Sequence, residues 1–344
     1  MNEDFRIEKQ GSETVLVKYY RNEETVKIPD GVTEIGYKAF EHRDRLKKII
    51  ISDSVTEIGD RAFSYCGNLE SVTIPDSVTT IGKSAFEHCD RLKKIIIPNS
   101  VTGIGNSAFK DCVRLEEVTI PNSVTKIGGY AFENCQSLES ITIPNGVTTI
   151  GLQMFWNCVN LKTITIPDSV TNIESNAFKN CTGLESITIP SSVTEIESSV
   201  FENTAYYNNS ENWGNDILYI DNYLIKAKSD IGEVTVKNGC KLIADDAFRD
   251  CENLESITIP DSVNKIGGGA FVRCENLESI TIPNGVTSIE YGTFGGCKSL
   301  KSVTIPDSVT TIGESAFEHC DKSLYCIRCV NQGSDRLRIL EICR

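Results

Sequence analysis

Cysteine is the residue type in this sequence with the widest range of chemistry, and the chain contains 14 cysteines. Thiolates can bind zinc, form disulfides or act as nucleophiles. Paired zinc-ligand spacing is absent from the main cysteine series, and free cysteine packs well as a small buried hydrophobic residue. We therefore predict a column of reduced cysteines, about 5 Å apart, inside the protein. The column comprises ten residues that share one position of a repeat: Cys66, Cys89, Cys112, Cys135, Cys158, Cys181, Cys251, Cys274, Cys297 and Cys320.

Histidines are the other residues that could support catalysis. His42, His88 and His319 all occupy one repeat position beside the cysteine column or its substitute, which indicates copies of a solvent-side turn residue. A glycine-rich phosphate loop, a metalloprotease helix motif and a nucleophile elbow are all missing from the sequence. We predict no catalytic residues, no cofactor and no enzymatic activity.

Two sets of residues could bind a metal. One is a column of Asp and Asn after an Ile-Pro dipeptide, but that position is ordinary turn chemistry, and the glycine pattern of calcium-binding solenoids is missing. The other is the pair Cys326 and Cys329, with Cys320 and Cys343 nearby, which lacks the second close pair of a zinc knuckle. The sequence therefore predicts no metal site. The Asp and Asn column comprises Asp30, Asp53, Asp76, Asn99, Asn122, Asn145, Asp168, Asp261, Asn284 and Asp307.

These columns exist because the chain is built from one 23-residue unit, L-x-x-I-x-I-P-x-x-V-T-x-I-G-x-x-A-F-x-x-C-x-x. A fixed period in this range marks a solenoid, in which each unit contacts its neighbours along one axis. Looser copies begin at Glu23 and Ile231. The regular copies begin at Leu46, Leu69, Leu92, Leu115, Leu138, Leu161, Leu184, Leu254, Leu277 and Leu300.

Each unit combines two periodicities. The copy that starts at Leu69 predicts an extended segment that Pro75 ends, followed by a turn and a second extended piece. The i, i+1, i+4 spacing of Ala85, Phe86 and Cys89 predicts one inward-facing helical turn. Stacking about 12 such coils gives an α/β-type, strand-rich solenoid with a parallel sheet on one side and short turns on the other.

The repeat also predicts the domain organisation. Residues 1–22 are expected to form a hairpin that caps the first coil, because an uncovered solenoid end exposes core and strand edge. A first array over 23–202 and a second over 231–322 flank a β-hairpin island at 203–230. Residues 323–344 are a degenerate C-terminal tail.

Ligand binding is predicted at two surfaces. Most outward places on the strands hold Ser or Thr, whereas Lys48, Ile50, Lys94, Ile96 and Glu117 depart from that pattern. Exposed isoleucines beside lysines are typical of a partner-binding patch. The alternative is that a 46-residue duplication copied Lys-Lys-Ile-Ile-Ile without any binding role.

The second predicted surface is the aromatic part of the island, with Tyr207, Trp213 and Tyr219, because aromatic anchors are enriched in interface hot spots. The alternative is a small satellite core under the hairpin.

Charge and hydropathy exclude some partners. The net charge of −14 argues against nucleic acid, whose binding needs a basic footprint. No run of 18 apolar residues is present, so we expect no membrane span. The first residues lack the basic and apolar segments of a signal peptide, which indicates either a cytoplasmic protein or an export signal outside this sequence.

The strings L-E-S-I-T-I-P-D-S-V-T and I-G-x-x-A-F-x-x-C closely resemble the BspA-like leucine-rich repeats over about residues 23–320. The resemblance implies a curved, right-handed leucine-rich-repeat superhelix and a location on the surface of host-associated bacteria or some protozoa, where several members act as adhesins. It implies no shared catalytic motif. We therefore predict a non-enzymatic, protein-binding or adhesive protein, secreted or on the cell surface, with host matrix or surface proteins among its possible partners. The alternative is a cytoplasmic scaffold or effector.

Overall fold

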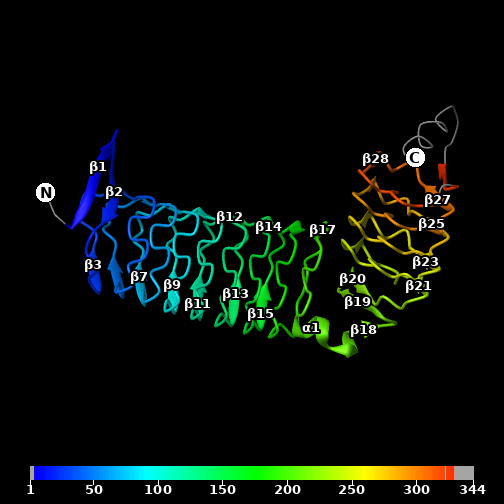
Figure 1. The fold of residues 1–344 in the computed structure, drawn as a ribbon, viewed down its shortest axis with the longest axis horizontal. Helices are drawn as coiled ribbons and strands as arrows, with labels where there is room; N and C mark the ends of the chain where they lie inside the picture. The colour runs from blue at the N-terminus through cyan, green and yellow to red at the C-terminus, as the bar shows by residue number, and fades with distance from the viewer. Residues whose placement is uncertain (1–3, 322, 329–344) are drawn as a thin grey trace. The chain divides into compact units, whose positions relative to one another are not determined.

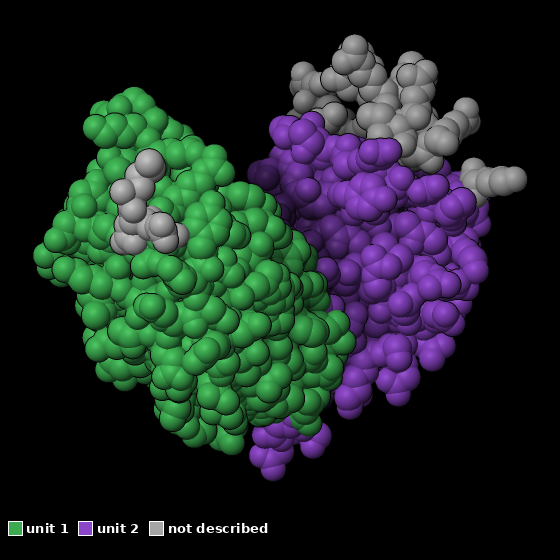
Figure 2. Space-filling view, turned by 60° about the vertical axis from the view of Figure 1, so that its left-hand side comes forward, with its two compact units in different colours: residues 1–193, 200–208 green, residues 194–199, 209–344 purple. Residues whose placement is uncertain are grey.

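The computed structural model describes residues 4–321 and 323–328. Contacts divide the chain into two compact units (Figure 2). Unit 1 comprises residues 1–193 and 200–208, and unit 2 comprises residues 194–199 and 209–344. Each unit is a stack of short coils (Figure 1).

The first extended segment of each coil in unit 1 forms a three-residue strand, and we call the surface of these strands the front face. Neighbouring strands pair in parallel with a register of 23 residues, so that Lys48 lies beside Ser71. Their middle residues face the core and their outer residues face solvent, as the period of 2 requires. They hydrogen-bond in three groups, β3-β5-β7, β9-β11 and β13-β15. These strands are β3 (Thr25–Lys27), β5 (Lys48–Ile50), β7 (Ser71–Thr73), β9 (Lys94–Ile96), β11 (Glu117–Thr119), β13 (Ser140–Thr142) and β15 (Thr163–Thr165).

The second extended piece forms a separate ladder of two-residue strands. At the N-terminal end of this ladder, β1 (Phe5–Gln10) and β2 (Glu13–Tyr19) form an antiparallel hairpin, and β2 pairs in parallel with the first coil. Gly11, with φ of 66°, takes the left-handed conformation in the hairpin turn. The two-residue strands are β4 (Glu34–Ile35), β6 (Glu57–Ile58), β8 (Thr80–Ile81), β10 (Gly103–Ile104), β12 (Lys126–Ile127), β14 (Thr149–Ile150) and β16 (Asn172–Ile173).

The island begins in unit 1 with helix α1 (Ala205–Asn208) and continues in unit 2 with a 3-10 turn at Ser210–Asn212. Three antiparallel strands follow, and the last of them pairs in parallel with the first coil of the second array. Unit 2 contains β17 (Glu195–Ile196), β18 (Trp213–Gly214), β19 (Ile217–Ile220), β20 (Tyr223–Ala227), β21 (Glu233–Thr235), β22 (Leu242–Ile243), β23 (Ser256–Thr258), β24 (Lys265–Ile266), β25 (Ser279–Thr281), β26 (Ser288–Ile289), β27 (Ser302–Ile305), β28 (Thr311–Ile312) and β29 (Tyr325–Arg328).

The segment predicted as a helical turn is instead a pair of tight turns, so this prediction is wrong. In the coil that starts at Leu69, Ser84 and His88 have φ near +55°, which no α-helix accommodates. Alternate N–H groups bond within the coil and to the next coil: Glu87 N to Ser84 O at 3.1 Å, and Phe86 N to Ala108 O at 2.8 Å. This third ladder satisfies the backbone groups that a helix would otherwise pair internally.

Columns of phenylalanine and cysteine run through the core of both units, among buried Leu, Ile, Val and Ala side chains. In unit 1 the rings from Phe40 to Phe201 stack from coil to coil, and the Phe86 and Phe109 centroids are 5.5 Å apart with planes tilted by 1°. The predicted cysteine column is also present, and its described members are free thiols. Most of these thiols donate to the phenylalanine carbonyl of the preceding coil, as Cys112 Sγ does to Phe86 O at 3.1 Å.

The predicted strand-rich leucine-rich-repeat solenoid is therefore confirmed, with two corrections. Among the described residues, α1 is a single short helix of 4 residues, so the helical share implied by the α/β label is almost absent. The stack has about 14 turns where we predicted about 12. The difference arises because segments outside the 23-residue pattern also join the ladders. Strand β29, for example, lies in the predicted tail and pairs with β27. The rest of that tail, residues 329–344, lies outside the described part.

Candidate functional site

The front-face residues predicted to bind a ligand lie on three strands of unit 1. Lys48 and Ile50 are on β5, Lys94 and Ile96 are on β9, and Glu117 is on β11. Ile50 is 37 % exposed and Ile96 is 58 % exposed, which is unusual for isoleucine on a folded surface. We call these five residues the front patch.

The front patch is interrupted by one coil. Strand β7 pairs with β5 and precedes β9 in the stack, so its Ser71 and Thr73 separate the two Lys and Ile pairs. Two strand spacings are about 10 Å. Glu117 is held in an ion pair, since Lys94 Nζ lies 2.7 Å from both of its carboxylate oxygens. The structure therefore places the two Lys and Ile pairs two strand spacings apart, and the charge of Lys94 is paired with that of Glu117.

The three island aromatic residues predicted to bind a ligand, Tyr207, Trp213 and Tyr219, are half-buried. Tyr219 packs against the hydrophobic core of unit 2, its hydroxyl accepts a hydrogen bond from Lys237 N at 3.2 Å, and burial raises its pKa. Trp213 lies on the neighbouring strand, and Lys228 Nζ is 5.9 Å from its ring centroid. Tyr207 belongs to α1 in unit 1. Tyr219 therefore packs between the island hairpin and the core of unit 2, and the side chain of Lys228 lies over the Trp213 ring.

A stacked ring ladder on the turn side was not predicted as a unit. Tyr65 is sandwiched between His42 and His88, with ring centroids 4.8 and 4.6 Å apart. His88 Nε2 lies 3.3 Å from Asp111 Oδ2. Because all four residues share one repeat position, the period of 23 could have revealed the ladder.

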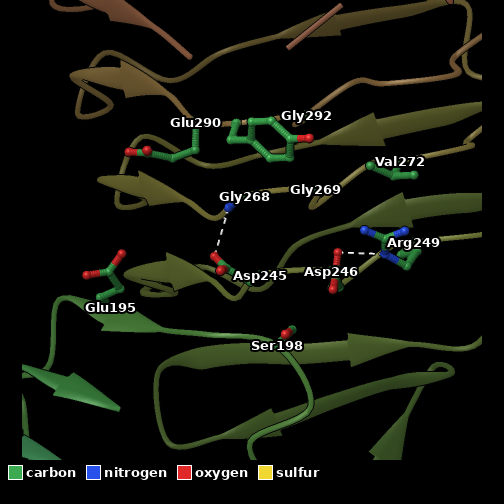
Figure 3. A pocket seen from close by; sticks show the side chains of 11 residues that line it. Glu195, Ser198, Asp245, Asp246, Arg249, Gly268, Gly269, Val272, Glu290 and Gly292 are labelled. Atoms are coloured by element: carbon green, nitrogen blue, oxygen red, sulfur yellow. Dashed lines mark hydrogen bonds and ion pairs between the residues drawn. The ribbon is translucent and has the colours of Figure 1, made fainter. Parts of the chain in front are cut away.

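Unit 2 contains a hollow of about 310 Å³ (Figure 3). It forms where three glycines, Gly268, Gly269 and Gly292, line its wall without side chains. The Asp245 carboxylate accepts a hydrogen bond from Gly268 N at 2.8 Å, and Asp246 Oδ1 lies 2.7 Å from Arg249 Nε. Sequence reasoning missed this hollow because successive glycines in a repeat carry no chemical signal of their own.

Asp245 is the most strongly perturbed acid described in the chain. Burial raises its pKa to about 7, with further contributions from the nearby charges of Glu195 and Glu197, although the Gly268 hydrogen bond acts in the opposite direction. Glu290, also in the wall, differs: burial would raise its pKa, but hydrogen bonds from Lys265 and Ser288 lower it. The other polar groups that line the hollow include Ser198, Glu195 and Asp246.

Most thiols of the cysteine column are buried. Burial raises the pKa of Cys66 and of Cys181 to about 12, so these thiols remain protonated and unreactive near neutral pH. Across residues 4–321 and 323–328, no cluster of three or more His, Cys, Asp or Glu residues is arranged to hold a metal ion. Cys329 and Cys343, part of the zinc alternative, lie outside the described residues.

The stacked coils, parallel front strands and internal phenylalanine column define the class of protein as a leucine-rich-repeat solenoid. A family model described as BspA type leucine rich repeat region matches residues 18–128, 102–231 and 218–332, in 6 copies. The chain belongs to this family.

Solved structures agree with this assignment. A leucine-rich cell surface protein of Faecalibacterium prausnitzii A2-165 is 32 % identical, with a TM-score of 0.50, over 97 % of this chain and 95 % of that one. A leucine-rich-repeat protein of T. pallidum is 31 % identical, with a TM-score of 0.52, over 54 % of this chain and 89 % of that one. A comparison with curated proteins finds no match.

Within the described part of the chain, no helix has the length and apolar character needed to cross a membrane.

Proposed function

We propose that this protein is a non-enzymatic, protein-binding or adhesive leucine-rich-repeat protein whose front patch contacts a macromolecular partner. The observation that carries the proposal is the exposure of Ile50 and Ile96 beside Lys48 and Lys94. Elsewhere on the front face of unit 1, the corresponding outward places hold mainly Ser and Thr. When a partner covers apolar side chains that were exposed to water, the free energy of the complex falls. The flanking cations orient the partner and speed its encounter with the protein.

We propose a location on the cell surface or in the secreted fraction, with protein ligands that include host matrix or surface proteins. Family membership supports this location, as does the similarity to a bacterial protein described as a cell surface protein.

A cytoplasmic scaffold or effector is the second candidate, and the column of free thiols favours it, because disulfides are rare in the cytosol. Buried thiols with raised pKa values also resist oxidation outside cells, so the column does not exclude export. Fractionation of the native host, with antibody detection on intact cells, separates the two candidates.

The test of the front patch uses a panel of immobilised matrix and cell-surface proteins and a fourfold variant, Lys48→Ser, Ile50→Ser, Lys94→Ser and Ile96→Ser. We expect at least a tenfold loss of affinity, about 1.4 kcal/mol, for any panel member that the wild type binds. The matched control is Thr142→Ser with Thr165→Ser, at the same outward position on β13 and β15, which should bind normally. Equal binding by the fourfold variant would remove the front patch from consideration.

A further inference from the structure

Asparagine followed by glycine is a chemically labile pair, and the sequence contains three such pairs. Each pair forms the two central residues of a tight turn, and all three asparagines are exposed to solvent. Glycine has no Cβ beside its main-chain nitrogen, so that nitrogen can approach the preceding side-chain amide without hindrance. The surroundings of each turn therefore decide whether the pair reacts. The three pairs are Asn145-Gly146, Asn238-Gly239 and Asn284-Gly285.

The three turns differ in the orientation of the Asn–Gly peptide group. Each turn is closed by a hydrogen bond of 3.0 to 3.2 Å from the residue after the glycine to the residue before the asparagine. Gly239 has φ of 82°, as the third residue of a type II turn does. Gly146 and Gly285 are not among the glycines with positive φ, which fits a type I turn. These two turn types differ by a flip of the central peptide group, so the glycine N–H points in opposite directions.

The flip decides which glycine nitrogen is hydrogen-bonded. Gly239 N donates to Ser262 Oγ, on the next coil, at 3.2 Å. Gly146 N and Gly285 N, both within the described residues, donate no hydrogen bond to the protein. The attacking nitrogen is therefore restrained in one pair and unrestrained in the other two.

A serine follows each pair by 23 residues, but its hydroxyl has a different partner in the two type I turns. Ser169 Oγ donates to Val147 O at 2.6 Å, and Ser308 Oγ donates to Val286 O at 2.7 Å. The same hydroxyl position thus contacts the glycine nitrogen in one turn and the carbonyl group of the following residue in the other two.

Deamidation begins when the glycine nitrogen attacks Cγ of the asparagine side chain. A C–N bond forms, the side-chain nitrogen leaves as ammonia together with the proton of the attacking N–H, and a cyclic succinimide remains. Water then opens the ring at one of its two carbonyl groups, which yields aspartate or isoaspartate. A nitrogen whose proton is donated to an acceptor is slower to attack, because that hydrogen bond must break first.

We propose that Asn145 and Asn284 are sites of spontaneous deamidation in the folded protein, and that Asn238 is protected by the hydrogen bond from Gly239 to Ser262. This modification is independent of the proposed binding function and requires no enzyme or cofactor, since water is its only co-reactant.

The two products differ in their effect on the fold. Aspartate occupies the same repeat position in other coils, for example Asp76 and Asp168, so this product adds a charge without altering the main chain. Isoaspartate inserts one extra carbon into the main chain between β13 and β14, or between β25 and β26. We expect it to weaken the pairing of β14 with β16 and of β26 with β28, whose registers that length of chain maintains.

The test follows all three sites in the full chain at mildly alkaline pH with a reductant, in the native state and in urea. Peptide mapping by mass spectrometry detects the replacement of NH2 by OH, and isoaspartate-specific methylation separates the two products. In urea the turns are lost, so the three sites should react at similar rates. In the native protein we expect Asn238 to react about fivefold more slowly than Asn145 and Asn284, as one main-chain hydrogen bond implies.

Two serine variants isolate the protecting bond. Ser262→Ala removes the acceptor of the Gly239 N–H, and Asn238 should then react about as fast as Asn145. The matched control is Ser169→Ala, which removes the equivalent hydroxyl above Asn145. Because that hydroxyl donates to a carbonyl group and does not accept from the attacking nitrogen, the rate at Asn145 should not change.

Three results would overturn the proposal: equal rates at the three sites in the native protein, an unchanged rate at Asn238 in Ser262→Ala, or intact Asn145 and Asn284 in native protein after the urea-unfolded chain has reacted. None of these measurements involves the front patch, so the deamidation sites and the proposed function can fail independently.

Discussion

Asp245 gives the sharpest test of the electrostatics, through the substitution Asp245→Asn. Asparagine has nearly the same shape and keeps an oxygen that can accept the Gly268 N–H bond, but it cannot ionise. Since burial and neighbouring acids raise the pKa of Asp245 to about 7 from an ordinary value of 3.8, the substitution removes a charge that the folded protein disfavours.

The sign follows from proton linkage. Below pH 3.8 the carboxyl group is protonated in the folded and unfolded states, so it adds no pH dependence. Between about pH 4 and pH 7 the unfolded state loses its proton while the folded state keeps it, and stability falls as the pH rises. The full pKa difference corresponds to about 4 kcal/mol. Because the side chain is only half-buried, solvent screening reduces this value, and we expect the variant to be about 1–3 kcal/mol more stable than the wild type at pH 8.

The assay is urea unfolding from pH 4 to pH 8, followed by Trp213 fluorescence in a Trp156→Phe background. Trp213 belongs to unit 2, so its signal reports the unit that contains Asp245 even if the two units unfold separately. The control is Asp261→Asn, which removes an exposed carboxylate from the same unit. A stability difference for Asp245→Asn that does not change between pH 4 and pH 8 would refute the assigned pKa and the environment inferred from it.

Two further predictions concern packing. Gly105→Ala should destabilise unit 1 by several kcal/mol or prevent folding, because an added Cβ would lie 2.5 Å from Lys83 N and 2.6 Å from Gly82 C. The control is Gly103→Ala, two residues earlier, where an added Cβ meets nothing within 4 Å. This control should change the midpoint of thermal unfolding by little. The thiol of Cys112 is fully buried, and burial raises its pKa. A thiol-specific reagent, followed by peptide mapping, should therefore label Cys112 in urea but not in the native protein. Rapid labelling of the native protein would contradict the closed core.

The sequence predicted the coils well and one of their segments poorly, for a definable reason. Ala85, Phe86 and Cys89 do face inward, as their spacing indicates, but two consecutive tight turns give the same facing pattern as one helical turn. Hydrogen bonds to the next coil, such as His88 N to Lys110 O at 2.9 Å, decide between them. Those bonds join residues 22 positions apart, so local periodicity cannot reveal them.

The C-terminal strand shows the same limit. In the sequence, Leu324 lies one residue later than the 23-residue spacing from Leu300 predicts, which suggests that the repeat register slips after Cys320. The backbone nevertheless keeps the 23-residue register, pairing Ser302 with Tyr325, because the ladder of β27 fixes it.

By itself, the sequence determined the class of fold, the column of reduced cysteines and phenylalanines, and which outward places depart from Ser and Thr. A strict repeat specifies these features because every coil places equivalent side chains at equivalent positions. Tertiary structure alone decided how exposed Ile96 is and why Asp245 holds its proton. Each of these depends on groups from neighbouring coils and on the water that they exclude, and a one-dimensional pattern contains neither.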